Sequence, residues 1–286
     1  MSEVEPWNVP GGPRIGVRRW GDPATPAVLL HGLGASSEHY EPLAPVLIEA
    51  GWQAHALDFR GHGHSDHVPG TYTIEHYAAD VEAYLEALGS PAALIGHSLG
   101  GAVTVYLAGE RPDLVLGGFA EDPPLYHGQP GAMEGSVYAS NFTATRDAID
   151  QLRHSDDPEP GIRALLDARR APGGGRWADS VSPAAFEARV QSYLRCDTGN
   201  WDAAIRGTSL AGWDPDRPVT VPLTILRADS SLGPGLTADE ADRFRLANPQ
   251  AEVIEIFGAP HGIREHRATA PRYVDELTRF LASLRS

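Results

Sequence analysis

The sequence predicts an α/β protein with a mostly parallel central sheet that carries helices on both faces. Up to residue 122, short apolar runs alternate with amphipathic stretches of helical spacing, an alternation typical of successive βαβ units. Strand-like runs then stop and return only at residue 223. We therefore expect one core, residues 1–122 and 219–286, interrupted by a helical insertion at 123–218.

The predicted strands are short apolar runs, the first of which end at Gly, His or Asp. In chain order they cover residues 27–30, 53–58, 91–95, 114–120, 223–226 and 253–257. The predicted helices have apolar residues every three or four positions; in residues 73–88, for example, Tyr77, Val81, Tyr84, Leu85 and Leu88 share one face. The other predicted helices cover residues 40–50, 99–109, 145–153, 162–170, 183–195 and 272–284.

Composition excludes several classes of function. The 286 residues carry a formal net charge of -15, which disfavours binding to nucleic acid or to an anionic membrane surface. All 23 basic residues are arginine, so a Schiff-base lysine and a Walker-A lysine are both excluded. The acidic start, MSEVEPWNVP, has no apolar signal region, and Cys196 has no second cysteine with which to pair. These features favour a cytoplasmic protein.

The strongest motif is Gly96-His97-Ser98-Leu99-Gly100. A predicted strand precedes it and a helix of small residues follows it, which is the context that a nucleophile elbow requires. The motif therefore predicts that Ser98 is an exposed nucleophile at a helix N-terminus, where the helix dipole favours developing negative charge.

Three further motifs complete a series. They are His31-Gly32-Leu33-Gly34, the segment from Asp58 to Ser65 (DFRGHGHS), and Gly258-Ala259-Pro260-His261-Gly262. In this order, with the serine motif between them, they resemble the α/β-hydrolase superfamily over nearly the whole chain outside the insertion. The histidines at 62, 64 and 67 could form a metal cluster, but the structural turn of the family explains them, and we predict no metal and no cofactor.

The resemblance assigns roles to particular residues. It implies that His261 is the general base and that the backbone N–H groups of Leu33 and Leu99 form the oxyanion hole. Two carboxylates remain open for the triad acid. Asp122 lies 24 residues after Ser98, at the end of the next predicted strand, an arrangement that resembles some lactone hydrolases of the superfamily. Asp229 lies two residues before the position that most members of the superfamily use. We favour Asp122 and keep Asp229 as the alternative.

The resemblance also implies that residues 123–218 form a helical cap over Ser98. This segment is rich in large aromatic residues, namely Tyr126, Tyr138, Phe142, Trp177, Phe186, Tyr193, Trp201 and Trp213. We expect an apolar, enclosed pocket. Its predicted lining includes His31, Gly32, His97, Tyr126, Trp177 and Trp201.

The predicted function is hydrolysis of a carboxylic ester or lactone, with an apolar or aromatic small-molecule substrate, by a Ser-His-Asp triad through an acyl-enzyme. A serine at position 98 disfavours the alkyl-enzyme chemistry of the dehalogenases, which resemble this fold but use aspartate there. The alternatives are a C–C bond hydrolase, a perhydrolase, or a non-catalytic small-molecule receptor that retains the fold. The sequence does not indicate the oligomeric state.

Overall fold

The computed structural model describes residues 3–285, and these form one sheet of eight strands in the order β1-β2-β4-β3-β5-β6-β7-β8. From β4 onward neighbouring strands are parallel, whereas β1 and β2 are antiparallel additions at one edge. The strands are β1 Val4–Asn8, β2 Arg14–Trp20, β3 Thr25–Leu30, β4 Trp52–Leu57, β5 Ala92–His97, β6 Val115–Glu121, β7 Leu223–Ala228 and β8 Glu252–Ile256. The predicted mostly parallel sheet is confirmed.

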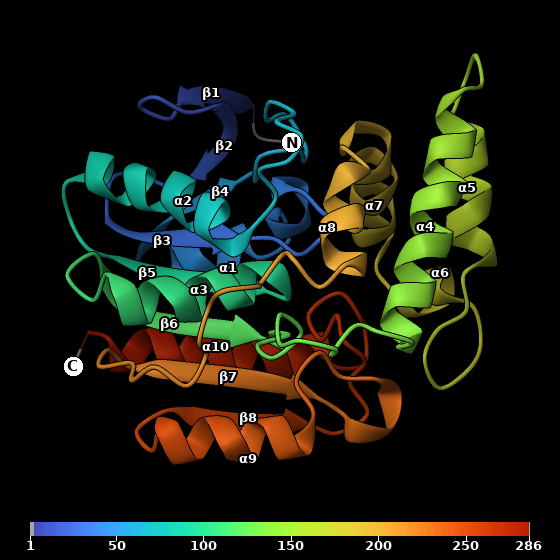
Figure 1. The fold of residues 1–286 in the computed structure, drawn as a ribbon. Coiled ribbons are helices and arrows are strands. Elements are labelled where there is room, and N and C mark those ends of the chain that lie inside the picture. Colours follow the sequence, from blue (N-terminus) through green and yellow to red (C-terminus); the bar gives the residue numbers. More distant parts are fainter. Residues whose placement is uncertain (1–2, 286) are drawn as a thin grey trace.

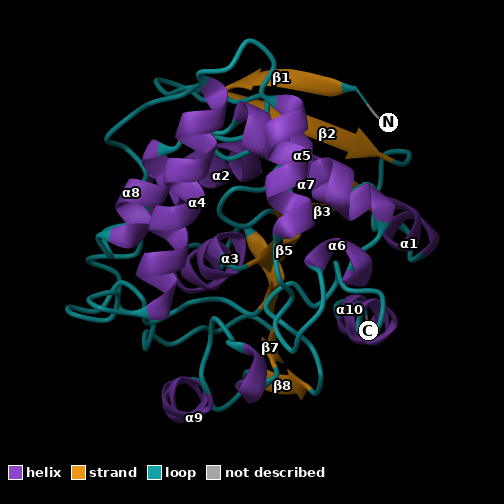
Figure 2. Cartoon of the chain, turned by 90° about the vertical axis from the view of Figure 1, so that its right-hand side faces the viewer, coloured by secondary structure: helices purple, strands orange, loops and turns teal. Residues whose placement is uncertain are grey.

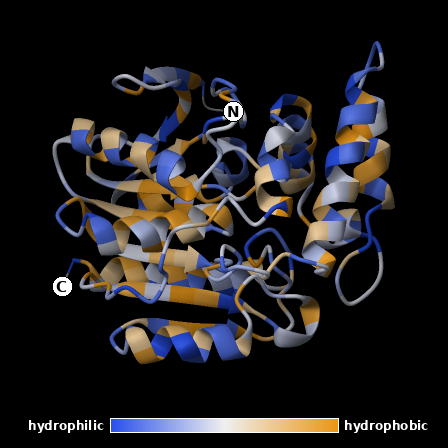
Figure 3. Cartoon of the chain, viewed as in Figure 1, coloured by the Kyte–Doolittle hydropathy of each residue, from blue (hydrophilic) through white to orange (hydrophobic). Residues whose placement is uncertain are grey.

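Helices cover both faces of this sheet (Figures 1 and 2). One face packs against α2 Ile74–Leu88, α3 Leu99–Glu110 and α9 Ala238–Ala247. The opposite face packs against α1 Ala44–Glu49 and α10 Ala270–Ser283. Apolar residues gather on the central strands, while the helices carry both apolar and polar residues (Figure 3). This two-sided cover explains why the inner strands read as continuous apolar runs.

Five helices join β6 to β7 and lie beyond the carboxyl ends of the strands (Figure 1). They are α4 Val137–Arg153, α5 Glu159–Ala168, α6 Trp177–Ser180, α7 Pro183–Arg195 and α8 Gly199–Ile205. Their shared apolar cluster includes Ile149, Ile162, Leu166, Val190 and Trp201, all buried. The insertion therefore has a core of its own.

Five strands and α-helices of the described chain were not predicted, namely β1, β2, α6, α8 and α9. Strand β1 contains Pro6 and is largely exposed, so it shows no apolar run; such a strand is tolerated because it lies at the sheet edge. Its partner β2 was missed with it. Helix α9 was missed although Thr237 and Glu240 form a capping box at its start, a signal that the sequence does contain. In addition, α4 begins eight residues before the predicted helix at Thr145.

The DFRGHGHS segment is a tightly bonded turn after β4. The Asp58 carboxylate accepts hydrogen bonds from the backbone N–H groups of Ser37 and His64, at 2.6 and 2.9 Å. Arg60 forms a two-point ion pair with Asp80 on α2, at 2.7 and 2.6 Å. A Cβ on Gly63 would collide with the Asp58 carboxylate. These contacts give the segment a structural role.

Within the described part of the chain, no helix has both the length and the apolar composition that crossing a bilayer requires. Cys196 is buried with a free thiol, and burial raises its pKa to about 12.

Candidate active site

Ser98 occupies the sharp turn between β5 and α3. Its φ of 52° lies in the left-handed region, which is unfavourable for a residue with a Cβ. The flanking glycines are required by space, because a Cβ on Gly96 would collide with the Gly100 carbonyl and one on Gly100 with the Leu30 carbonyl. The motif spacing thus follows from the packing of the turn against the neighbouring strand.

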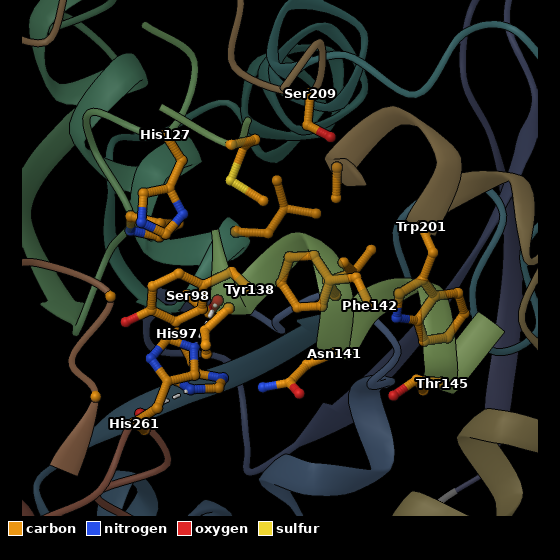
Figure 4. A pocket seen from close by; sticks show the side chains of 18 of the residues that line it. His97, Ser98, His127, Tyr138, Asn141, Phe142, Thr145, Trp201, Ser209 and His261 are labelled. Carbon is orange, nitrogen blue, oxygen red and sulfur yellow. Dashed lines mark hydrogen bonds between the residues drawn. The ribbon is translucent and has the colours of Figure 1, made fainter. Parts of the chain in front are cut away.

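Ser98, His261 and Asp122 form a chain of hydrogen bonds (Figure 4 shows its first two members). His261 Nδ1 lies 2.6 Å from Asp122 Oδ2, and His261 Nε2 lies 2.9 Å from Ser98 Oγ. A carboxylate can only accept, so Nδ1 must carry the proton, and the Nε2 lone pair is then free to accept the Ser98 hydroxyl proton. The geometry is that of a nucleophile, a base and an orienting acid.

Asp122 is fully buried at the end of β6. Besides His261, its carboxylate accepts hydrogen bonds from the backbone N–H groups of Ala228 and Gly235, at 3.0 and 2.6 Å. Within residues 3–285, Asp122 and Ser98 are the only non-glycine residues with positive φ. Backbone strain is therefore concentrated at two members of the hydrogen-bonded chain, as is common at functional sites.

Asp229, the alternative acid, lies outside this chain. Its carboxylate accepts hydrogen bonds from the Ser231 backbone and hydroxyl, at 2.8 and 2.7 Å, and from the Gly258 backbone at 2.8 Å. These bonds lower the pKa of Asp229 to about 2. The carboxylate caps a short 3-10 helix at Ser230–Leu232 and ties it to the loop after β8.

His97 lies beside the base. Its Nε2 is 3.1 Å from the backbone carbonyl of His261, and the two rings are 5.0 Å apart. Facing a carbonyl, Nε2 must carry a proton and donate it. Burial, aided by the charge of Arg264, holds the pKa of His97 well below its ordinary value, so the ring stays neutral. His97 thus braces the loop that carries His261.

The predicted oxyanion donors lie at the cavity above Ser98. Leu33 and Leu99 both line it. Their backbone N–H groups donate to no other group in residues 3–285. Two unused donors beside a nucleophile are what a developing oxyanion requires.

The cavity above Ser98 has a volume of about 650 Å³. Helix α4 contributes Tyr138, Asn141, Phe142 and Thr145, which follow one helix face and point into the cavity in Figure 4. Tyr193, Trp201, Met133 and Leu210 extend the apolar wall. Ser98 and His261 both line this space, so a small molecule bound there would lie beside them.

Carboxylate side chains are absent from the cavity wall, as far as the described residues go. The residues that line the cavity include Arg169 and Arg189 but no aspartate or glutamate. His127 also faces the space (Figure 4), and burial lowers its pKa, so that it is a neutral polar group there. The site therefore offers no anion that would attract a cationic ligand.

Four residues of the predicted lining lie elsewhere, and two lie in the cavity. His97 and Trp201 line it, whereas His31, Gly32, Tyr126 and Trp177 do not. His31 is fully buried, and its ring forms hydrogen bonds with the Phe59 N–H and the Gly32 carbonyl, at 3.0 and 2.8 Å. A Cβ on the neighbouring Gly32 would lie 2.8 Å from His97 Nδ1 and 3.1 Å from Ser98 Cβ, so Gly32 packs directly against the turn that carries Ser98.

Tyr126 and Trp177, the two predicted aromatic lining residues that lie outside the cavity, have structural roles. The Tyr126 hydroxyl donates to Asp216 at 2.6 Å, and the Arg243 guanidinium stacks on its ring. Trp177 packs against Phe186 inside the insertion. The sequence singled out Tyr138, Phe142 and Tyr193 as cap aromatics but could not tell which of them face Ser98.

No group of three potential metal-ligating side chains comes together anywhere in residues 3–285. Of the histidines weighed as a cluster, His62 is buried against His31 and Tyr77. The His67 ring instead bonds the Arg195 carbonyl at 2.9 Å.

Comparison with known proteins agrees with this fold. The family described as alpha/beta hydrolase fold matches residues 25–156. An esterase of Mycobacterium tuberculosis is 28% identical over 272 residues, which cover 93% of this chain and 85% of that protein. The 2-(acetamidomethylene)succinate hydrolase of Mesorhizobium japonicum is 29% identical over 83% of this chain and 82% of that protein.

Among solved structures, an enol-lactonase from Burkholderia xenovorans superposes with a TM-score of 0.71 at 20% identity, over 97% of this chain and 100% of that one. At this identity the likeness concerns the fold. The chain has the α/β-hydrolase fold, and the relatives named here are hydrolases.

Proposed function

We propose that the chain is a cofactor-independent serine hydrolase that cleaves a carboxylic ester or a lactone. The observation that carries this proposal is the hydrogen-bonded chain from Ser98 through His261 to Asp122, which opens into a mostly apolar cavity. A serine nucleophile with a histidine base is suited to acyl transfer.

In the proposed reaction, Ser98 Oγ attacks the carbonyl carbon while His261 Nε2 takes the hydroxyl proton. The negative charge that develops on the carbonyl oxygen is met by the N–H groups of Leu33 and Leu99. His261 then protonates the leaving alkoxide, the C–O bond breaks and an acyl-enzyme remains. A water molecule, deprotonated by His261, attacks the acyl-enzyme and restores Ser98. The Asp122 carboxylate stabilises the imidazolium in both halves.

We further propose that residues 123–218 act as a cap that selects the substrate. Four aromatic side chains of this segment, Tyr138, Phe142, Tyr193 and Trp201, line the cavity. Together with the lack of acidic side chains among the described lining residues, they favour a neutral or anionic substrate with an apolar or aromatic body. A cytoplasmic location stays a prediction.

The test is labelling of the purified protein with a fluorophosphonate probe, combined with a panel of p-nitrophenyl esters of increasing chain length and aromatic lactones. We expect labelling of the wild-type protein, none of Ser98→Ala, and turnover of at least one class of substrate. A protein that neither labels nor turns over any substrate would support the receptor alternative instead.

A further inference from the structure

Arg189, on α7 of the insertion, is buried between two loops of the candidate site. It is 8% exposed. Its Nη1 donates a hydrogen bond to the Gly34 carbonyl at 3.1 Å, and its Nη2 donates to both carboxylate oxygens of Glu265, at 3.1 and 3.2 Å. One guanidinium thus joins the Gly-rich loop after β3 to the loop that follows β8.

The contact with Gly34 bears on the proposed oxyanion donor. The loop turns tightly, with the Ala35 N–H donating to the Gly32 carbonyl at 3.1 Å. Gly34 itself has a φ of 66°, and a Cβ there would lie 2.8 Å from Trp201 Cη2 and 3.3 Å from Tyr193 Cε1. The turn bond joins the Gly34–Ala35 peptide group to the Gly32–Leu33 peptide group, which carries the Leu33 N–H, and Arg189 bonds the carbonyl of the former. Together the two bonds therefore restrict the direction of the Leu33 N–H.

The contact with Glu265 bears on the proposed base. Glu265 is four residues after His261, and its own N–H donates to the Gly262 carbonyl at 3.2 Å. Burial by itself would raise the pKa of the Glu265 carboxyl, but the Arg189 charge, with His39 and Arg264, outweighs burial and lowers it. The pair is therefore ionised, and its geometry is held by charge-assisted hydrogen bonds.

We propose that Arg189 is a positioning residue that aligns the Leu33 oxyanion donor with His261, so that the insertion helps to build the active site as well as covering it. This inference rests on the proposed hydrolase function. Arginine suits the task because its rigid fork can bond a carbonyl and a carboxylate at once, whereas a lysine ammonium at the same place would reach one of them.

A competing role follows from the cavity. Arg189 also lines it, and its Nε has no partner among the described residues. A guanidinium that contacts an anionic substrate would act mainly on KM. A guanidinium that only positions the oxyanion donor acts on the transition state and therefore on kcat. The two roles are thus separable by kinetics.

The experiment compares R189M, R189K and the double variant R189M/E265Q with wild type. R189M leaves the buried Glu265 carboxylate without its hydrogen-bond donor, because the nearest atoms of Arg264 and His39 are 3.9 and 3.8 Å away, and this loss destabilises the fold. The double variant removes that uncompensated charge but does not restore the bond to Gly34. The matched control is R163Q, which removes an exposed ion pair with Glu159 and Glu187 on the same insertion.

We expect R189M/E265Q to recover much of the melting temperature lost in R189M while kcat stays about 10- to 100-fold below wild type. KM for neutral p-nitrophenyl esters should change by less than about threefold. Affinity for a trifluoromethyl ketone, whose adduct places an oxyanion in the hole, should fall in parallel with kcat. R189K should lose kcat as well, and R163Q should match wild type.

Two results would overturn the proposal. Recovery of kcat together with the melting temperature would mean that Arg189 only holds the fold. A rise in KM confined to anionic esters, with kcat unchanged, would make it a substrate contact. Hydrogen exchange of residues 31–36 provides a readout that needs no turnover, and we expect faster exchange in R189M/E265Q. If wild type has no hydrolase activity, the proposed function fails, and unchanged exchange would separately refute the positioning role.

Discussion

Replacing Asp122 by asparagine tests the proposed triad most directly. The backbone can accept the change, because asparagine tolerates the positive φ of 43° that Asp122 adopts. The side chain cannot. Its carboxylate accepts from the Ala228 N–H on one oxygen and from the Gly235 N–H and His261 Nδ1 on the other, whereas an amide has only one oxygen to offer.

Each orientation of the amide has a different cost. If its NH2 group faces Gly235 and His261, it meets the Gly235 N–H donor to donor, while Nδ1 becomes an acceptor and the proton moves to Nε2. The base can then no longer accept the proton of Ser98. If the NH2 group faces the Ala228 N–H instead, two donors meet in a buried site, which costs about 1–3 kcal/mol of folding free energy, and the imidazolium still loses its counter-charge.

We therefore expect Asp122→Asn to lower kcat by about 10⁴-fold, equivalent to about 5.5 kcal/mol of transition-state stabilisation. The assay is steady-state hydrolysis of a p-nitrophenyl ester, with the fold checked by circular dichroism. The matched control is Asp229→Asn, which removes one of the two oxygens that bond Ser231 and Gly258. It should keep kcat within about threefold of wild type. Comparable losses in both variants, or less than a tenfold loss in Asp122→Asn, would refute the assignment.

Three further outcomes are expected. Ser98→Ala should lower turnover by several orders of magnitude without reducing the melting temperature, and unchanged turnover in a preparation free of contaminating esterase would exclude the nucleophile. Gly34→Ala should reduce kcat, because the added Cβ collides with the indole of Trp201 in the insertion. The control Gly11→Ala should leave kcat unchanged, since Gly11 has a similar φ of 69° but open space around it. Equal kcat in the two variants would contradict this. Burial lowers the pKa values of His31 and His62 to about 3. In the unfolded chain these pKa values are near 6.5, so the unfolded chain binds more protons than the folded one in acid. The stability contributed by the neutral rings is therefore complete above pH 6.5 and is lost as the pH falls toward 3. At pH 5 the loss is about 2 kcal/mol for each histidine, and urea titrations that give the same unfolding free energy at pH 7.5 and pH 5 would disprove it.

Much of the core and the serine turn follows from local rules in the sequence. Buried parallel strands need apolar residues on both faces, so β3 and β5 appear as unbroken runs. The turn at Ser98 needs glycines at 96 and 100 because no side chain fits there. Requirements of this kind concern a few neighbouring residues, and a single sequence can reveal them.

The tertiary structure decided what depends on pairing across the chain. Asp122 lies beside His261 because β6, β7 and β8 pair in parallel, with the Asp122 N–H bonded to the Leu226 carbonyl at 2.7 Å. Asp229, one residue beyond β7, is used by its own turn instead. Strand order and register set these positions, and sequence spacing alone left both carboxylates open.

The insertion shows the same limit more strongly. Its aromatic content predicted an apolar pocket, but which rings face the cavity depends on how five helices pack over the sheet. Arg189 and Glu265 are 76 residues apart, and neither belongs to a motif. Only the docking of α7 against both loops brings them together, because an ion pair of this kind carries no periodic or local signal in the chain.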